Sequence, residues 1–518
     1  MLAGYVSDEN YVALPGVLLE FVNTAGSVEV TSRASGSISV DIQPGLYRVT
    51  LSKTGFTPKT VEVMCDGERP HAFRLMSDRM CGFMWPKWVR SGDSSEYCVH
   101  ATQEFRLDLW RYGWDKQFIR SFGWCDEHGP RAMAQILPDG DFTQTGVGWN
   151  RVGYTLQFQK HALPAPARSG LYYLHATTRG GQSCAFPWIV SPARPQARTA
   201  VLASTITWNA YNKFGGRSNY FNQDALPDRP VVNARQEVKR YTQPDTWPFE
   251  DSGAPLSFQR PEPASEVALD AQITDSIPGR MGSCFAGGEW RLLGWLEREN
   301  FDYDLYSETE LHFDRVPIDE YDVLILNNHP EYWSADMYHK VKSWVYERGG
   351  KLVYPGGCGL YAEVEFADEW TIRCRREGEW QQRGESAEHL LGVAYTHSGF
   401  QTGAPYRVLD ETHWAFSGTG LSNGDEFGKH SLHERCPGGA SAHELDKIGP
   451  DSPEGIQHLA KGTNPDGQGA DMTVFETPSG GSVFAAGSLC WTLSLPVDEG
   501  ASAVMKNVLQ RFLTAATG

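Results

Sequence analysis

The chain contains 518 residues, more than one ordinary hydrophobic core can organise, so we expect two to four domains. Hydrophobic residues make up 40% of it and charged residues 21%, a balance typical of folded globular proteins that excludes wholesale disorder. The 46 basic and 64 acidic residues give a net charge of −18 without any basic run, which argues against nucleic acid and anionic membranes as partners.

The lack of a signal pattern and the scattered cysteines predict a reducing compartment. No run of about eighteen uncharged apolar residues occurs, so we expect no membrane-spanning helix. The first residues, MLAGYVSDENY, lack the basic and then apolar pattern of a secretory signal. Ten cysteines are spread thinly without a CxxC pair. We therefore expect a cytoplasmic protein.

Residues 1–78 are predicted to form a small β-sandwich. The segments SISVDI (37–42), YRVTLS (47–52) and KTVEVM (59–64) alternate apolar and polar side chains and are separated by turn residues. Their layout resembles the carboxypeptidase-regulatory-like, prealbumin-type modules. That resemblance implies a spacer or docking module without chemistry of its own.

A second β-sandwich is predicted over residues 79–195. The segments EFRLDLWRYGW (104–114) and SGLYYLHATT (169–178) alternate in the same way. The segment SPARPQAR (191–198) is rich in Pro and Arg and has no periodicity, as expected of a connection between domains.

Residues 196–518 are predicted to form a doubly wound α/β domain of the flavodoxin-like type, which makes the whole chain multidomain α+β. The runs at 199–206, 322–328 and 351–357 are typical of strands buried on both faces. Helical spacing follows at 288–299 and 334–350. Because ligands bind beyond the carboxyl ends of parallel strands, the residues after these runs are the candidates for function.

The run 322–328 leads directly into His329 and Glu331. An imidazole and a carboxylate two residues apart on a rigid strand end could ligate a metal, or act as a base and its orienting group. The alternative is a helix entrance, in which Glu331 stabilises the positive end of the next helix.

Two more strand ends carry candidate side chains. The stretch 207–220 is a polar, aromatic and Gly-containing loop that includes Tyr211 and Tyr220, and its alternative is a buried aromatic turn. Cys358 stands among glycines after the run 351–357, an arrangement similar to a nucleophile elbow. A small buried hydrophobe is the alternative there.

Several motifs in sequence order carry a family resemblance. They are AYNKFGG, LLGWLERENFDYDLYSETELH, HPEYWS, FGK and the tail VFAAGSLCWTLSL…NVLQRFL. Together they resemble the large (beta) subunit family of N,N-dimethylformamidase over roughly residues 80–518. The resemblance implies a class I glutamine-amidotransferase-like α/β domain behind β-sandwiches. It also implies hydrolysis of N,N-dimethylformamide to formate and dimethylamine at a mononuclear iron, Fe³⁺, held by tyrosinates and a glutamate beside a histidine.

The resemblance assigns roles to residues of this sequence. Glu331 matches the ligand carboxylate, His329 the adjacent histidine and Tyr211 one tyrosine ligand. No Tyr stands in the segment LSFQRP (256–261), near which the second tyrosine is expected, so Tyr220 is the substitute that we name.

Two further residues complete the candidates. Glu444 matches a family segment that carries an acidic residue near the site, whereas the family usually has Asn where this chain has Cys358. The resemblance also implies a small companion subunit and homo-oligomerisation.

From this resemblance we expect hydrolysis of the C–N bond of a small amide by a metal-activated water. Hard phenolate and carboxylate oxygens suit ferric iron, which agrees with the metal that the resemblance implies. His329 or Glu444 would carry the proton to the departing amine. Two alternatives stay open: a thiol hydrolase or amidotransferase-like enzyme with Cys358 as nucleophile, and a non-catalytic binding protein.

Overall fold

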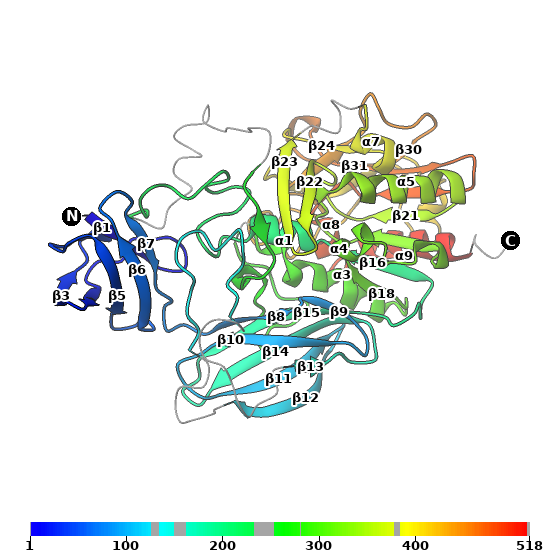
Figure 1. Ribbon diagram of the computed structural model, residues 1–518. Helices are drawn as coiled ribbons and strands as arrows, with labels where there is room; N and C mark the ends of the chain where they lie inside the picture. Colours follow the sequence, from blue (N-terminus) through cyan, green and yellow to red (C-terminus); the bar gives the residue numbers. More distant parts are fainter. Residues whose placement is uncertain are drawn as a thin grey trace.

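The computed structural model describes residues 2–125, 134–149, 162–232, 253–279, 281–377 and 384–514. Figure 1 shows an N-terminal β module, a second β module below it and a larger C-terminal body that holds the helices. The described chain is multidomain and mostly β, with few helices. None of the helices in these ranges combines the length and the apolar character that crossing a membrane requires.

The N-terminal module consists of two sheets with the strand orders β3-β2-β5-β6 and β4-β1-β7. Val6, Phe21, Val49 and Phe73 are fully buried between the sheets. The predicted strands at 47–52 and 59–64 lie in β5 and β6, whereas only the first half of 37–42 is a strand. The strands are β1 (Leu2–Ser7), β2 (Leu18–Asn23), β3 (Gly26–Thr31), β4 (Ser37–Ser39), β5 (Gly45–Ser52), β6 (Lys59–Cys65) and β7 (His71–Arg74).

The second module pairs a three-stranded sheet, β13-β10-β8, with a five-stranded sheet, β12-β11-β14-β15-β9. The predicted strands at 104–114 and 169–178 are β11 and β14, and they pair antiparallel. The strands are β8 (Cys81–Trp85), β9 (Trp88–Arg90), β10 (Ser94–His100), β11 (Phe105–Tyr112), β12 (Lys116–Cys125), β13 (Ala162–Pro164), β14 (Gly170–Thr178) and β15 (Ser183–Ser191).

A nine-stranded mixed sheet organises the C-terminal body, in the order β18-β16-β19-β21-β32-β31-β30-β26-β27. The first five strands are parallel and the rest pair antiparallel. In chain order these strands are β16 (Thr199–Ala203), β18 (Asp304–Ser307), β19 (Val323–Leu326), β21 (Lys351–Tyr354), β26 (Tyr406–Val408), β27 (Glu426–Phe427), β30 (Gln457–Gly462), β31 (Asp471–Glu476) and β32 (Ser482–Ala485).

Smaller sheets and helices cover this sheet. The α-helices are α1 (Thr205–Tyr211), α3 (Ala286–Arg298), α4 (Glu308–His312), α5 (Ala335–Arg348), α7 (Ala387–Leu391), α8 (Trp491–Ser494) and α9 (Glu499–Thr514). The remaining strands are β17 (Leu256–Ser257), β20 (Tyr332–Trp333), β22 (Ala362–Asp368), β23 (Thr371–Glu377), β24 (Ala394–Thr396), β25 (Gly403–Ala404), β28 (Ser441–Ala442) and β29 (Leu445–Lys447). The parallel half agrees with the expected strand–helix alternation, but the antiparallel half was not expected.

One predicted element is wrong in a way that matters for the site. The strand expected over 199–206 ends at Ala203, and α1 begins at Thr205, so Tyr211 ends a helix and does not lie in a loop. Every residue of α1 is buried, so packing on all sides overrides the β preference of its Thr and Ile residues. The helix expected over 334–350 is confirmed: Ser334 caps α5, and Gly349 ends it with a φ of 77°.

Candidate active site

The carboxylate of Glu331 is the centre of a buried polar cluster. The hydroxyl of Tyr211 donates a hydrogen bond to its Oε2, and the hydroxyl of Tyr220 donates to its Oε1 at 2.5 Å. Glu331 is 1% exposed and follows β19, whereas Tyr211 ends α1 and Tyr220 lies in the next loop. Side chains up to 120 residues apart therefore meet at one carboxylate.

His329 completes the cluster with a fixed orientation. Its Nδ1 lies 2.9 Å from the carbonyl oxygen of Gly357, which can only accept, so Nδ1 carries a proton. Its Nε2 lies 3.1 Å from Glu331 and 3.4 Å from Glu444. Burial alone would lower the pKa of His329, but Glu444, Glu331 and the Gly357 carbonyl outweigh it and raise the pKa to about 9.

A threonine hydroxyl joins the two segments that carry these residues. Thr207 of α1 donates to the carbonyl of His329 at 2.8 Å and accepts from the backbone N–H of Glu331 at 3.2 Å. These two bonds fix the end of the 322–328 run against the helix that presents Tyr211. Sequence reasoning missed Thr207, because a single hydroxyl in a polar loop gives no signal.

Arg260 holds the loop between the two tyrosines. Its guanidinium is fully buried and donates to the backbone carbonyls of residues 209, 212, 214, 217 and 257 at 2.7–3.4 Å. A buried guanidinium that binds carbonyls fixes the loop path through several bonds at once. Arg260 lies in the segment 256–261, near which the second tyrosine was expected. It contributes to the site by holding the loop that leads to Tyr220.

The two glycines of the AYNKFGG motif mark where the other modules touch this loop. A Cβ on Gly215 would lie 2.3 Å from a side-chain carbon of Thr143, and one on Gly216 would lie 2.4 Å from the Cβ of Tyr11. Both residues also have a positive φ, 105° and 90°, which favours glycine. The loop that carries Tyr220 is thus packed from outside the C-terminal body.

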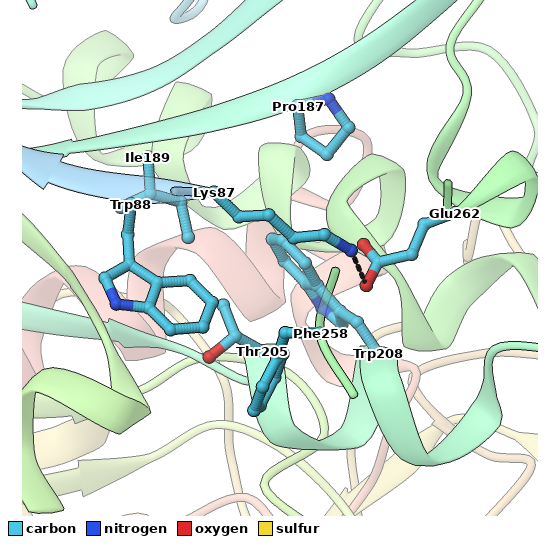
Figure 2. A pocket seen from close by; sticks show the side chains of 8 residues that line it. All are labelled: Lys87, Trp88, Pro187, Ile189, Thr205, Trp208, Phe258 and Glu262. Atoms are coloured by element: carbon cyan, nitrogen blue, oxygen red, sulfur yellow. Dashed lines mark ion pairs between the residues drawn. The ribbon is translucent and has the colours of Figure 1, made fainter. Parts of the chain in front are cut away.

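The second module supports α1 from its other side. Figure 2 shows Lys87 and Trp88 facing Thr205 and Trp208 of α1 across a small enclosed pocket. The ammonium of Lys87 lies 2.6 Å from the carboxylate of Glu262, and both side chains are buried. This buried ion pair joins the second module to the segment that follows β17.

The oxygens of the cluster suit a hard cation. Burial and the charge of Glu331 raise the pKa values of Tyr211 and Tyr220 well above the ordinary value of 10, so both phenols are neutral here. A bound cation would reverse that balance, because it stabilises phenolate. Among the described residues no group of three or more His, Cys, Asp and Glu side chains could hold a metal ion. A metal at this site would therefore depend on the tyrosine oxygens.

Glu444 and Cys358 lie beside the cluster. Glu444 is partly exposed and approaches His329 as given above. Cys358 is buried, has a φ of 55° and donates its backbone N–H to Asp446 at 2.7 Å. Asp446 also accepts from the hydroxyl of Tyr354 at 2.6 Å. Sequence reasoning named Glu444 and missed Asp446, although both belong to one Glu-Leu-Asp run.

Residues 106–503 match the family model described as "N,N-dimethylformamidase beta subunit-like, C-terminal". A protein from Paracoccus aminophilus named "N,N-dimethylformamidase beta subunit" is 24% identical over 416 residues, which are 68% of this chain and 53% of that protein. A protein of the same name from Alcaligenes sp is 25% identical over 283 residues, 43% of this chain and 36% of that protein. The matches thus cover about half of these relatives or less.

Solved structures give weaker matches. A DUF3823 family protein from Bacteroides ovatus has 10% identity and a TM-score of 0.13, with 36% of this chain and 98% of that chain covered. At that score the likeness carries no argument about fold or function.

Proposed function

This chain belongs to the N,N-dimethylformamidase beta subunit-like family, and from that premise we propose that it hydrolyses the C–N bond of a small amide. One observation carries the proposal: Tyr211, Tyr220 and His329 meet at the carboxylate of Glu331, in a buried cluster built from segments far apart in the sequence. The relatives' name supplies the substrate class, small N-substituted amides.

We propose that Tyr211, Tyr220 and Glu331 would hold a single ferric ion. Their oxygens are hard ligands, which supports iron over a soft metal. When bound, such an ion supplies Lewis acidity, which polarises an amide carbonyl and lowers the pKa of water.

The protein's own groups move the protons. Hydrolysis adds one water across the C–N bond, and the departing amine needs a proton that His329 can donate from Nε2. The Gly357 carbonyl fixes the ring for that transfer, and Glu331 and Glu444 stabilise its charged form. Glu444, which is partly exposed, can then exchange the proton with solvent.

The geometry gives less support to Cys358 as nucleophile. A thiol mechanism requires a base beside the sulfur, and His329 is the obvious candidate. Both ring nitrogens of His329 already face other partners, the Gly357 carbonyl on one side and carboxylates on the other. The metal-dependent mechanism therefore remains the one that we propose.

Two family-level expectations belong to the same proposal. The relatives are named as beta subunits, so we propose assembly with a companion subunit. We also propose that the C-terminal body is glutamine-amidotransferase-like, for which the five parallel strands of its sheet are the support.

The test is hydrolysis of N,N-dimethylformamide by purified protein, with formate and dimethylamine quantified together with the iron content and the visible absorption spectrum. We expect equimolar products, about one iron per chain and a tyrosinate-to-iron absorption band. The Tyr211→Phe variant should lose most of this absorption. Tyr47→Phe is the matched control, because Tyr47 lies in the N-terminal module. Iron-free, colourless and inactive protein would refute the proposal and favour a non-catalytic binding role.

A further inference from the structure

Three aromatic side chains gather at the surface next to the cluster. Tyr361 and Tyr395 are partly exposed and His397 is exposed. The rings of Tyr361 and Tyr395 meet edge to face with centroids 5.3 Å apart, and those of Tyr395 and His397 with centroids 5.2 Å apart. The two hydroxyls lie 3.3 and 3.4 Å from the two nitrogens of His397. We refer to these three residues as the aromatic rim.

The aromatic rim borders the buried site directly. The backbone N–H of Tyr361 donates to the carbonyl of Glu331 at 2.9 Å. Tyr395 lies opposite Asp446 in the pairing of β24 with β29, two residues from Glu444. Burial raises the pKa of Tyr395, and the charges of Cys358, Glu444, Asp446 and Glu331 raise it further, as expected of a hydroxyl near all four groups.

Two residues of the site reach solvent. Tyr220 and Glu444 are partly exposed, whereas Glu331 is 1% exposed. Of these two residues, Glu444 is two residues from Asp446, which pairs with Tyr395 of the aromatic rim. Exposed aromatic rings that cluster at one point are typical of a binding surface.

We propose that the aromatic rim is the substrate entrance and selects amides that carry N-alkyl groups. This inference rests on the proposed function. The carbonyl carbon must reach the buried cluster, so the substituents on nitrogen extend toward the aromatic rim. Aromatic faces attract methyl groups and alkylammonium ions, and the nearby carboxylates favour a cationic amine as it leaves. Formamide offers no such group.

Selectivity between two amides tests the inference. The ratio of kcat/KM for N,N-dimethylformamide to that for formamide should fall about tenfold in Tyr395→Ala, because the contact between ring and methyl groups is lost. Tyr395→Phe should keep the ratio, since the ring remains. Phe118→Ala is the control, because Phe118 is an exposed ring on β12 of another module. An unchanged ratio in both Tyr395→Ala and Tyr361→Ala would overturn the inference.

Binding of the amine alone separates this inference from the proposed function. Calorimetry with dimethylammonium chloride and ammonium chloride needs no turnover, so it decides the matter even if the wild-type protein hydrolyses no amide. We expect tighter binding of dimethylammonium and the loss of that preference in Tyr395→Ala. Equal binding of the two ions by the wild-type protein, or a preference that survives in Tyr395→Ala, would refute a role for the aromatic rim.

Discussion

At the scale of single residues, Glu331 is the most constrained group of the site. It accepts from two phenols, faces the imidazole of His329 and is almost wholly buried. A carboxylate with both oxygens engaged in this way must keep its charge or be replaced by a group of the same shape.

The Glu331→Gln variant should therefore separate chemistry from folding. The amide has the same shape and can still accept from one phenol, so the free energy of unfolding should change by only about 1 kcal/mol. Iron content and kcat/KM should fall at least about 100-fold, the upper end of losses seen for residues that merely support metal ligands. Urea denaturation, metal analysis and kinetics measure the three quantities. Full activity in this variant would exclude Glu331 as a ligand.

Cys358 provides a second test at this scale. The Cys358→Ser variant keeps the size and the backbone bond to Asp446, so we expect kcat/KM within about tenfold of the wild type. A thiol nucleophile predicts the loss of several orders of magnitude instead. Kinetics with the iron content of both proteins measured in parallel distinguishes the two mechanisms. Near-complete loss with iron retained would favour the thiol mechanism.

At the scale of elements, α1 depends on two buried glutamates from other helices. Glu289 of α3 accepts from the N–H of Ser204 at 2.9 Å and from the indole of Trp208 at 2.8 Å. Glu308 of α4 accepts from the N–H of Ile206 of α1 at 3.4 Å and from the indole of Trp333 at 2.7 Å. Burial raises the pKa of Glu308 from the ordinary value of 4.5 to about 8.

Protonation of Glu308 should make stability depend on pH. The unfolded carboxyl ionises near pH 4.5 while the folded one stays protonated to about pH 8, so the free energy of unfolding should fall as pH rises between these values. The slope is at most about 1.4 kcal/mol per pH unit. Glu308→Gln should lose less stability than the wild type between pH 5.5 and 7.5 in urea denaturation. Exposed Glu320→Gln is the control, and parallel curves for the wild type and Glu308→Gln would contradict this assignment.

How far the sequence predicted the site depends on the kind of signal. His329 and Glu331 follow a strand of buried apolar residues, and that local pattern with its proline predicted their place after β19. Tyr211 was named from the motif but placed in a loop, because the residues of α1 show no helical stripe when every face is buried. Arg260 could not be identified from sequence, since its role consists of contacts to backbone carbonyls.

At the scale of the whole molecule, the N-terminal module contacts the site loop through Arg74. This buried guanidinium donates to the carbonyls of Asp8, Glu9, Gly140 and Gly215 at 3.0–3.2 Å. The N–H of Gly215 in turn donates to the carbonyl of Glu9 at 2.8 Å. The module is therefore part of the structure that positions Tyr220.

Arg74→Met should weaken both stability and the site. Each buried hydrogen bond lost costs about 1–3 kcal/mol, so we expect the free energy of unfolding to fall by at least about 3 kcal/mol. Iron content should also fall, because the loop before Tyr220 loses an anchor. Arg48→Met is the matched control, since Arg48 is exposed on β5 of the same module. Stability or iron content equal to that of the control would show that the contact is dispensable.

The paired glycines at 215 and 216 also limit how such proteins can be recombined. Each is covered by a different neighbour, Gly215 by Thr143 and Gly216 by Tyr11, at distances that leave no room for a methyl group. A chimaera that takes its leading module from one homologue and its tyrosine loop from another must keep both surfaces matched. These modules should therefore be inherited and exchanged together, as a single evolutionary unit.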